Sequence, residues 1–167
     1  MHNLRQVFRT RLFCETDLLK NLQLQTSVAQ THFIFNVLRL KVGAKVLVFN
    51  AHSGEWVAEI VHLSKKEGLL SIKNCIRQPV KEQGPWLAFP LIKKSRTDFI
   101  IEKGTELGVE KFIPIYTNFT GPRRVSRDRL SAIAREASEQ CGRLSVPSVE
   151  DLIPFQELIG VLQKNIY

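Results

Sequence analysis

With 167 residues and 44% hydrophobic side chains, the chain can bury one ordinary core or two small ones, which argues against a disordered protein. Its 24 Lys and Arg against 16 Asp and Glu give a net charge of +8, a balance that favours polyanionic partners such as RNA. Three scattered cysteines argue against a disulfide framework or a zinc ribbon and indicate a reducing cytoplasm, and no apolar run reaches the roughly 20 residues of a membrane span.

Short strand-like runs fill the amino-terminal part of the chain. Strands are predicted at Gln6–Phe13, Lys45–Phe49, Glu55–Leu63 and Leu69–Ile76. One helix, Ser27–Val37, interrupts them, with Thr26 or Ser27 as its cap. The apolar positions of this helix that we expect to face inward are Val28, Phe33 and Val37. Short strands at close spacing predict a small β-barrel over residues 1–76.

The pattern changes at residues 77–85, where two prolines, a glycine and charges indicate a linker. Beyond it, over residues 86–167, strands and helices alternate: strand Trp86–Ile92, helix Thr97–Leu107, strand Lys111–Tyr116, helix Arg127–Gln140, a short run at Val146–Val149 and a helix from Pro154. This alternation predicts parallel βαβ units, and Gly108 suits the left-handed residue after a helix. Three strands make only part of an α/β sheet, so we expect this domain to be incomplete.

Residues 1–80 carry 11 basic and 5 acidic side chains, so the amino-terminal part holds most of the excess positive charge. Arg11, Arg39 and Lys41 are our candidates for RNA contacts there. Aromatic side chains such as Phe8 and Phe33 lie among the cations. Single-stranded RNA recognition uses such a mixture, but core packing explains the aromatic positions better, because they fall on the apolar faces of the predicted elements.

Two basic segments of the second domain follow predicted strands. Lys93, Lys94 and Arg96 come after the strand Trp86–Ile92, where open α/β sheets place their ligands, so we expect phosphate contacts. A second pair, Arg123 and Arg124, follows the next strand and would open onto the same edge of the sheet. Ordinary surface charge remains the other interpretation of this pair.

Glu139, Gln140 and Arg143 stand at the end of the predicted helix Arg127–Gln140, and the i,i+4 spacing of Glu139 and Arg143 puts them on one face. They form either a surface ion pair or a site where a guanidinium meets substrate oxygens. Phosphate-binding, dinucleotide, serine-hydrolase and zinc-protease motifs are all absent from the sequence. The four histidines share no metal-ligand spacing, so no metal site is predicted.

Several stretches together resemble the ribosomal RNA small subunit methyltransferase E family. The stretches are Thr10–Phe13, His32–Gly43, Leu91–Lys94, Glu102–Val109, Glu139–Arg143 and Val146–Pro147. They occur in order over essentially the whole chain, and the combination of Val-Leu-Arg, Glu-Leu-Gly-Val and Glu-Gln-Cys-Gly-Arg is specific.

The resemblance implies an α+β protein in which a PUA-like RNA-binding β-barrel precedes a SPOUT methyltransferase domain of the trefoil-knot type. It implies a cytoplasmic homodimer, with no membrane partner, that methylates N3 of one uridine in 16S ribosomal RNA of the small subunit and uses S-adenosylmethionine. In that reaction negative charge develops on uracil O2 and O4, and by resemblance Arg143 would stabilise it with Glu139 or Gln140 orienting the guanidinium.

The chain departs from the family pattern at its end. The family's glycine-rich loop and final helix, which grip the cofactor, would lie beyond Tyr167, so we expect an incomplete SPOUT domain and leave cofactor-binding residues unassigned. A non-catalytic RNA-binding or ribosome-associated module is therefore the alternative function. A different α/β enzyme acting on a nucleotide-like substrate is a third.

Overall fold

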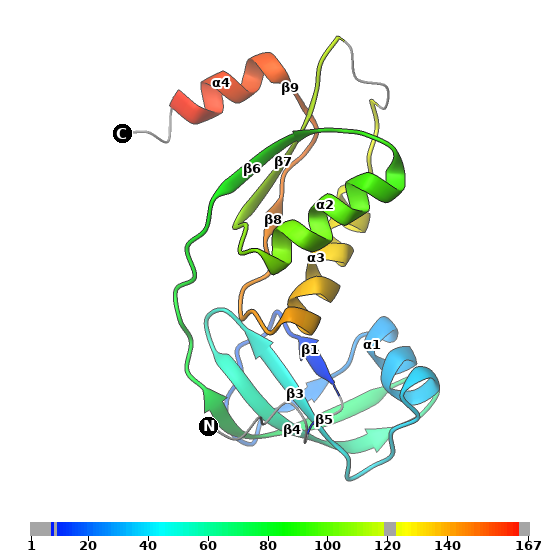
Figure 1. The fold of residues 1–167 in the computed structure, drawn as a ribbon. Coiled ribbons are helices and arrows are strands. Elements are labelled where there is room, and N and C mark those ends of the chain that lie inside the picture. The colour runs from blue at the N-terminus through cyan, green and yellow to red at the C-terminus, as the bar shows by residue number, and fades with distance from the viewer. Residues whose placement is uncertain (1–7, 9, 119–122, 164–167) are drawn as a thin grey trace. The chain divides into compact units, whose positions relative to one another are not determined.

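The computed structural model describes residue 8, residues 10–118 and residues 123–163. The chain divides into two compact units, residues 1–81 and residues 82–167, and Figure 1 shows the elements of each in chain order. No helix in the described part of the chain is long and apolar enough to cross a bilayer.

The first unit is built on a five-stranded sheet with the order β1-β3-β4-β5-β2. The strands are β1 (Arg11–Phe13), β2 (Gln23–Gln25), β3 (Lys45–Asn50), β4 (Gly54–Leu63) and β5 (Gly68–Arg77). β1 pairs with β3 in parallel, and the other pairs are antiparallel. Three register shifts between β4 and β5 curl the sheet, because each bulge adds local twist. Of the predicted strand Gln6–Phe13, residues 6, 7 and 9 lie outside the described residues.

Alternate side chains of the three long strands fill the core of this unit. Val46 and Val48 of β3 pack there with Ile60 of β4 and Ile72 of β5, and all four are fully buried. Short runs rich in β-branched and aromatic residues make such strands predictable, and the predicted strands over Lys45–Ile76 match β3, β4 and β5 to within two residues. β2 was not predicted, since Gln23–Gln25 holds two glutamines around one leucine.

The predicted helix of the first unit exists, but its geometry changes midway. α1 (Val28–His32) starts with a capping box, in which Ser27 and Gln30 exchange side-chain bonds with each other's backbone N–H. The next five residues, Phe33–Val37, form a π-helix, labelled η2. The expected inward face is therefore partly wrong: Val28 is 82% exposed and Val37 57% exposed. Thr31 and Ile34 are buried instead.

The second unit is a parallel sheet between helices. Its strands are β6 (Trp86–Pro90), β7 (Lys111–Tyr116), β8 (Ser148–Val149) and β9 (Ile153–Pro154), and its helices are α2 (Lys94–Glu106), α3 (Arg127–Cys141) and α4 (Phe155–Gln163). β7 is central, with β6 on one side and both β8 and β9 paired to β7 in parallel. The predicted alternation of strands and helices in this domain is thus confirmed.

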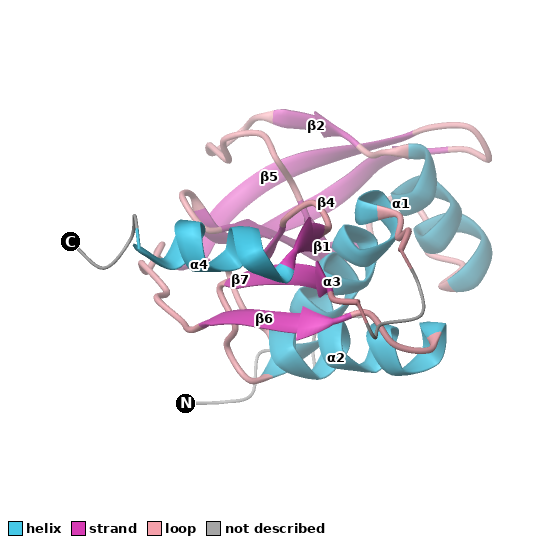
Figure 2. Ribbon diagram, turned by 90° about the horizontal axis from the view of Figure 1, so that it is seen from above, coloured by secondary structure: helices cyan, strands magenta, loops and turns pink. Residues whose placement is uncertain are grey.

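Side chains of β6 and β7 alternate between two apolar clusters. Phe89 and Phe112 pack with Ile101 of α2 and Leu130 of α3. The other face, which includes Ile113 and Ile115, packs with Leu158 of α4. The sheet thus lies between the pair α2 and α3 and the single helix α4 (Figure 2).

Candidate functional site

Two polypeptide turns meet at the edge of the second unit's sheet where its strands end. β6 leads directly into α2, and Leu91 donates its N–H to the Ile115 carbonyl of β7, which holds the two strand ends together. β7 ends at Tyr116, and α3 begins at Arg127 on the same side. Residues Lys93–Arg96 and Arg123–Ser126 therefore share the carboxyl edge of the sheet, as predicted from the order of the elements.

The first basic segment belongs to the helix and not to a loop. α2 begins three residues earlier than predicted: Lys93 is its N-cap, and Arg96 lies in its first turn. The amides of Arg96 and Thr97 both donate to the Lys93 carbonyl, which closes that turn. Gly121 and Pro122, the start of the second predicted basic loop, lie outside the described residues.

The carboxyl edge carries exposed cations without acidic partners. Among the described residues, no ion pair forms at the five predicted phosphate contacts, which are Lys93, Lys94, Arg96, Arg123 and Arg124. Two neighbouring arginines differ, since Arg127 pairs with Asp151 and Arg129 with Asp98. The first turn of α2 also contains no acidic residue. Cations at a helix N-terminus oppose the helix dipole, so a bound anion would stabilise this arrangement.

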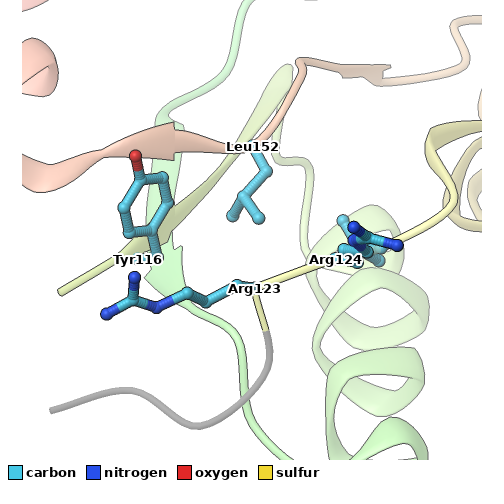
Figure 3. A pocket seen from close by; sticks show the side chains of 5 residues that line it. Tyr116, Arg123, Arg124 and Leu152 are labelled. Carbon is cyan, nitrogen blue, oxygen red and sulfur yellow. The ribbon is translucent and has the colours of Figure 1, made fainter. Parts of the chain in front are cut away.

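Two adjoining grooves lie at this edge. The first has a volume of about 530 Å³ and is lined by Tyr116, Arg123, Arg124, Val125 and Leu152. The second, of about 360 Å³, has Lys94, Thr97, Ser126 and Arg129 in its wall and shares Arg124 and Val125 with the first. In Figure 3 the Arg123 side chain extends toward Tyr116, and Arg124 extends the opposite way. The shared residues make the two grooves one continuous site.

Arg143, the residue predicted to act on the uracil, lies at the opposite edge of this sheet. Its Nη1 donates to the carbonyl of Thr105 (2.9 Å), in the last turn of α2, and to the carbonyl of Val109 (2.7 Å), between α2 and β7. Its Nη2 donates to Ser145 Oγ at 2.9 Å. The side chain is only 12% exposed. The guanidinium thus ties the end of α2 to the loop after α3.

Glu82 is a partner of Arg143 that the sequence did not suggest. Its carboxylate lies 3.5 Å from Arg143 Nε and accepts hydrogen bonds from the amides of Leu144 and Ser145 and from the Ser145 hydroxyl. Partial burial alone would raise the pKa of Glu82, but these hydrogen bonds and the charge of Arg143 together lower it from its ordinary value of 4.5. Glu82 falls in the predicted linker, where an acidic residue is usually solvated and gives no signal.

Glu139 and Gln140 occupy the last turn of α3, near the same edge as Arg143. Glu139 is half-buried, while Gln140 is exposed and bonds Glu136 at 3.4 Å. The structure thus brings the predicted catalytic residues together with one another. It does not bring them to the edge that holds the predicted phosphate contacts of this unit.

The first unit holds a separate basic groove of about 500 Å³, lined by Arg39, Lys41, Lys45, Phe8 and Gly43 among others. Arg39 has a positive φ of 51°, a left-handed conformation that is rare for a non-glycine residue. It directly follows Leu38, the C-cap of the π-helix, and so presents its exposed side chain beside Lys41. None of Arg39, Lys41 and Lys45 forms an ion pair with a described residue.

Arg11 lies in the interior of the first unit. Its side chain is 8% exposed, its Nε is bonded to Glu55, and its guanidinium stacks 4.0 Å from the ring of Phe49. A buried cation with these partners cannot also contact a phosphate. Arg11 is therefore not among the proposed RNA contacts. In the described residues, no three His, Cys, Asp or Glu side chains gather as metal ligands.

Comparison with protein-family models assigns both units. A model described as an RNA methyltransferase domain matches residues 81–167, and a model described as an RNA methyltransferase PUA domain matches residues 27–73. The chain belongs to the RNA methyltransferase family. Its predicted fold, a PUA-like domain followed by a SPOUT-type domain, is confirmed.

Relatives in this RNA methyltransferase family bear the name ribosomal RNA small subunit methyltransferase E. The protein from Rickettsia conorii is 31% identical over 156 residues, which cover 93% of this chain and 63% of the relative. The protein from Bacillus subtilis is 34% identical over 148 residues, covering 80% and 55%. The chain therefore spans about three fifths of the length of these relatives.

A solved structure with the same name, from Neisseria gonorrhoeae, superposes with a TM-score of 0.77 over 90% of this chain and 64% of the other. That protein was crystallised with S-adenosyl methionine bound. At 22% sequence identity this likeness establishes only the fold of this RNA methyltransferase chain.

Proposed function

We propose that this chain is part of a methyltransferase that uses S-adenosylmethionine to methylate N3 of a uridine in 16S ribosomal RNA of the small ribosomal subunit. The family match and the names of the relatives support the reaction class. The observation that carries the RNA part is the carboxyl edge of the second unit, where exposed cations without acidic partners line two joined grooves.

The described cations fit an RNA backbone. Phosphates are spaced along a strand, and each one neutralised by Lys or Arg releases counterions. Lys94 and Arg124 line the second groove, and Arg39 and Lys41 line the groove of the first unit, so each unit offers its own phosphate contacts. Lys93 and Arg96 extend the basic surface of the second unit.

Arg143 is better suited to a positioning role than to contact with uracil. A guanidinium that stabilises O2 and O4 of the reacting base must direct donors at those oxygens. Both Nη atoms of Arg143 are directed at atoms of the protein instead. We propose that Arg143, with Glu139 and Gln140 beside it, holds the end of α2 and thereby the strand that leads to the carboxyl edge.

The described grooves do not by themselves fit the cofactor. S-adenosylmethionine carries a positive sulfonium and an ammonium group, whereas the charged residues that line the two grooves are all cations in the described part of the chain. The cofactor is therefore proposed for the whole protein only. Homodimerisation and a cytoplasmic location are proposed on the family resemblance.

A non-catalytic RNA-binding module is the second candidate, and the mismatch between the grooves and the cofactor favours it for this chain on its own. Incubation of small ribosomal subunits that lack the modification with radiolabelled S-adenosylmethionine separates the two. The whole protein should transfer a methyl group to uridine N3, detected by nucleoside chromatography. The double variant Lys94→Ala, Arg124→Ala should lower kcat/KM by about 10-fold or more, since each phosphate contact contributes on the order of 1 kcal/mol.

A matched control is the double variant Lys65→Ala, Lys66→Ala, which removes two exposed lysines of the turn between β4 and β5. It should retain most of the activity. Methylation at another base or atom, or none by the whole protein, would contradict the proposed reaction. RNA binding by the whole protein without turnover would support the binding module.

A further inference from the structure

We propose that the first groove of the second unit holds one nucleobase of single-stranded RNA stacked on Tyr116, while the second groove holds the phosphate next to it. This inference rests on the proposed function and names the form of RNA that the site accepts. Among the described residues that line the two grooves, Tyr116 is the one aromatic side chain.

The surroundings of Tyr116 suit a flat, partly apolar group. Tyr116 is half-buried at the end of β7, and Leu152, just before β9, lines the same groove. The pairing of Tyr116 with Pro154 fixes β7 and β9 side by side at this point, so two strands hold the backbone that carries the ring. A ring held in place loses little entropy when a base stacks on it.

The Arg123 guanidinium lies over the Tyr116 ring without closing on it. The Arg123 guanidinium carbon lies 6.0 Å from the ring centroid (Figure 3). Where a cation does close on a ring in this chain, the distance is shorter, 4.0 Å for Arg11 over Phe49 and 4.2 Å for Lys111 over Trp86. A base between two planar groups needs about 7 Å, or two contacts of roughly 3.5 Å. A small outward movement of the exposed Arg123 side chain gives that space.

The second groove supplies the charge that a nucleotide needs on its other side. Lys94 and Arg124 line it and have no acidic partner among the described residues, and Arg124 also lines the first groove. A base and its neighbouring phosphate can therefore bind on either side of Arg124. In a duplex the base edges are paired and the ring faces are stacked on their neighbours, so this arrangement selects an unpaired strand.

Fluorescence anisotropy with a short oligouridylate, alone or annealed to its complement, tests the inference on the 167-residue chain. Tyr116→Ala should weaken binding of the single strand about 5- to 150-fold, the range expected for loss of one stacked base. Tyr116→Phe should bind within about 2-fold of the unchanged chain, because the stacking ring remains. Phe99→Ala is the matched control: Phe99 is 59% exposed on α2 and lines neither groove.

Salt titration distinguishes the base from the phosphate. Tyr116→Ala should leave the slope of log K against log salt unchanged, whereas Lys94→Ala and Arg124→Ala should each lower its magnitude by about 0.7. Thermal unfolding of each variant verifies that the fold is retained. If Tyr116→Ala binds as tightly as the unchanged chain, or if duplex and single strand lose affinity equally, the inference is wrong while the proposed RNA methyltransferase function stands. Absence of salt-dependent RNA binding by the unchanged chain would overturn both.

Discussion

Arg143 donates to the carbonyl oxygens of Thr105 and Val109, and both atoms lose a donor if the guanidinium is removed. Arg143→Ala also leaves the partly buried Glu82 carboxylate without its cation. Loss of the Arg143 guanidinium should therefore cost about 2–4 kcal/mol of unfolding free energy. The midpoint of urea unfolding of the second unit should shift to a clearly lower urea concentration. Trp86 lies in this unit and Trp56 in the other, so tryptophan fluorescence in a Trp56→Phe background reports on the second unit.

A surface arginine gives the comparison for this variant. Arg127 pairs with Asp151 at 3.4 Å, and both side chains are more than half exposed, so Arg127→Ala should cost at most about 0.5 kcal/mol. Equal urea midpoints for Arg143→Ala and Arg127→Ala would contradict the positioning role of Arg143.

Glu82 makes the stability of the second unit depend on acid pH. Its pKa is lowered in the folded chain, against the effect of partial burial, by hydrogen bonds from Ser145 and Leu144 and by the charge of Arg143. A lowered folded pKa stabilises the fold above the ordinary value of 4.5, and this stabilisation is lost as the pH falls through the folded pKa. The difference in unfolding free energy between the unchanged chain and Glu82→Gln should therefore shrink below about pH 4.5. A difference that stays constant from pH 7 to the acid range would contradict this assignment.

The contacts of Arg143 could not be predicted from sequence. The spacing of Glu139 and Arg143 is a local signal, visible along one helix. The contact with Glu82 joins residues 61 positions apart in the chain, and nothing in a single sequence marks such a pair. The cations at the carboxyl edge were predictable, since the order of strands and helices alone determines which loops share an edge.

At the scale of elements, Gly104 explains how closely α2 approaches β7. A Cβ at this position would lie 2.7 Å from the Phe112 ring, and Phe112 is fully buried in the core. Glycine inside a helix is normally unfavourable, but here the missing Cβ leaves room for the Phe112 ring. Gly104→Ala should destabilise the second unit by about 1–3 kcal/mol through overpacking, measured by the urea unfolding described above.

Gly160 of α4 gives the control for this substitution. Nothing lies within 4 Å of a Cβ built there, so Gly160→Ala should stabilise the helix by about 0.5–1 kcal/mol. Opposite signs for the two substitutions are expected, and a stabilising Gly104→Ala would show that α2 and β7 pack less closely than described.

Elements with strong periodicity were the predictable ones. β7 was predicted with its correct bounds, and α3 to within one residue, because each has a clear apolar pattern with recognisable ends. The π-helix Phe33–Val37 was not predictable, since a single wider turn leaves the apolar spacing of an α-helix almost unchanged. The early start of α2 was missed because Lys93 offers no side-chain cap and its first turn is basic.

At the scale of the whole molecule, the net charge of +8 is organised as separate basic grooves in two units. The first unit contributes Arg39, Lys41 and Lys45, none of them paired with an acid in the described part of the chain. Arg39 reaches this groove from a left-handed backbone position, at a conformational cost of about 1–2 kcal/mol, which favours a functional reason for its place. The second unit contributes its own cations at the carboxyl edge of the sheet.

These two sets of cations predict how RNA binding by the whole chain depends on salt. A triple alanine variant of Arg39, Lys41 and Lys45 should lower the magnitude of the salt slope by about 2, because each phosphate contact with a single strand contributes about 0.7. A triple alanine variant of Lys93, Lys94 and Arg124 should lower the magnitude of the slope by the same amount. If one single strand contacts both units, the combined variant should lower the magnitude of the slope by the sum of the two decreases. Anisotropy titrations from about 50 to 300 mM salt measure the slopes.

The variant Lys20→Ala removes an exposed lysine that lines none of the three basic grooves and should leave the slope unchanged. A slope that only one triple variant changes would assign RNA contact to that unit alone, and a flat response of the unchanged chain would contradict RNA binding through either surface.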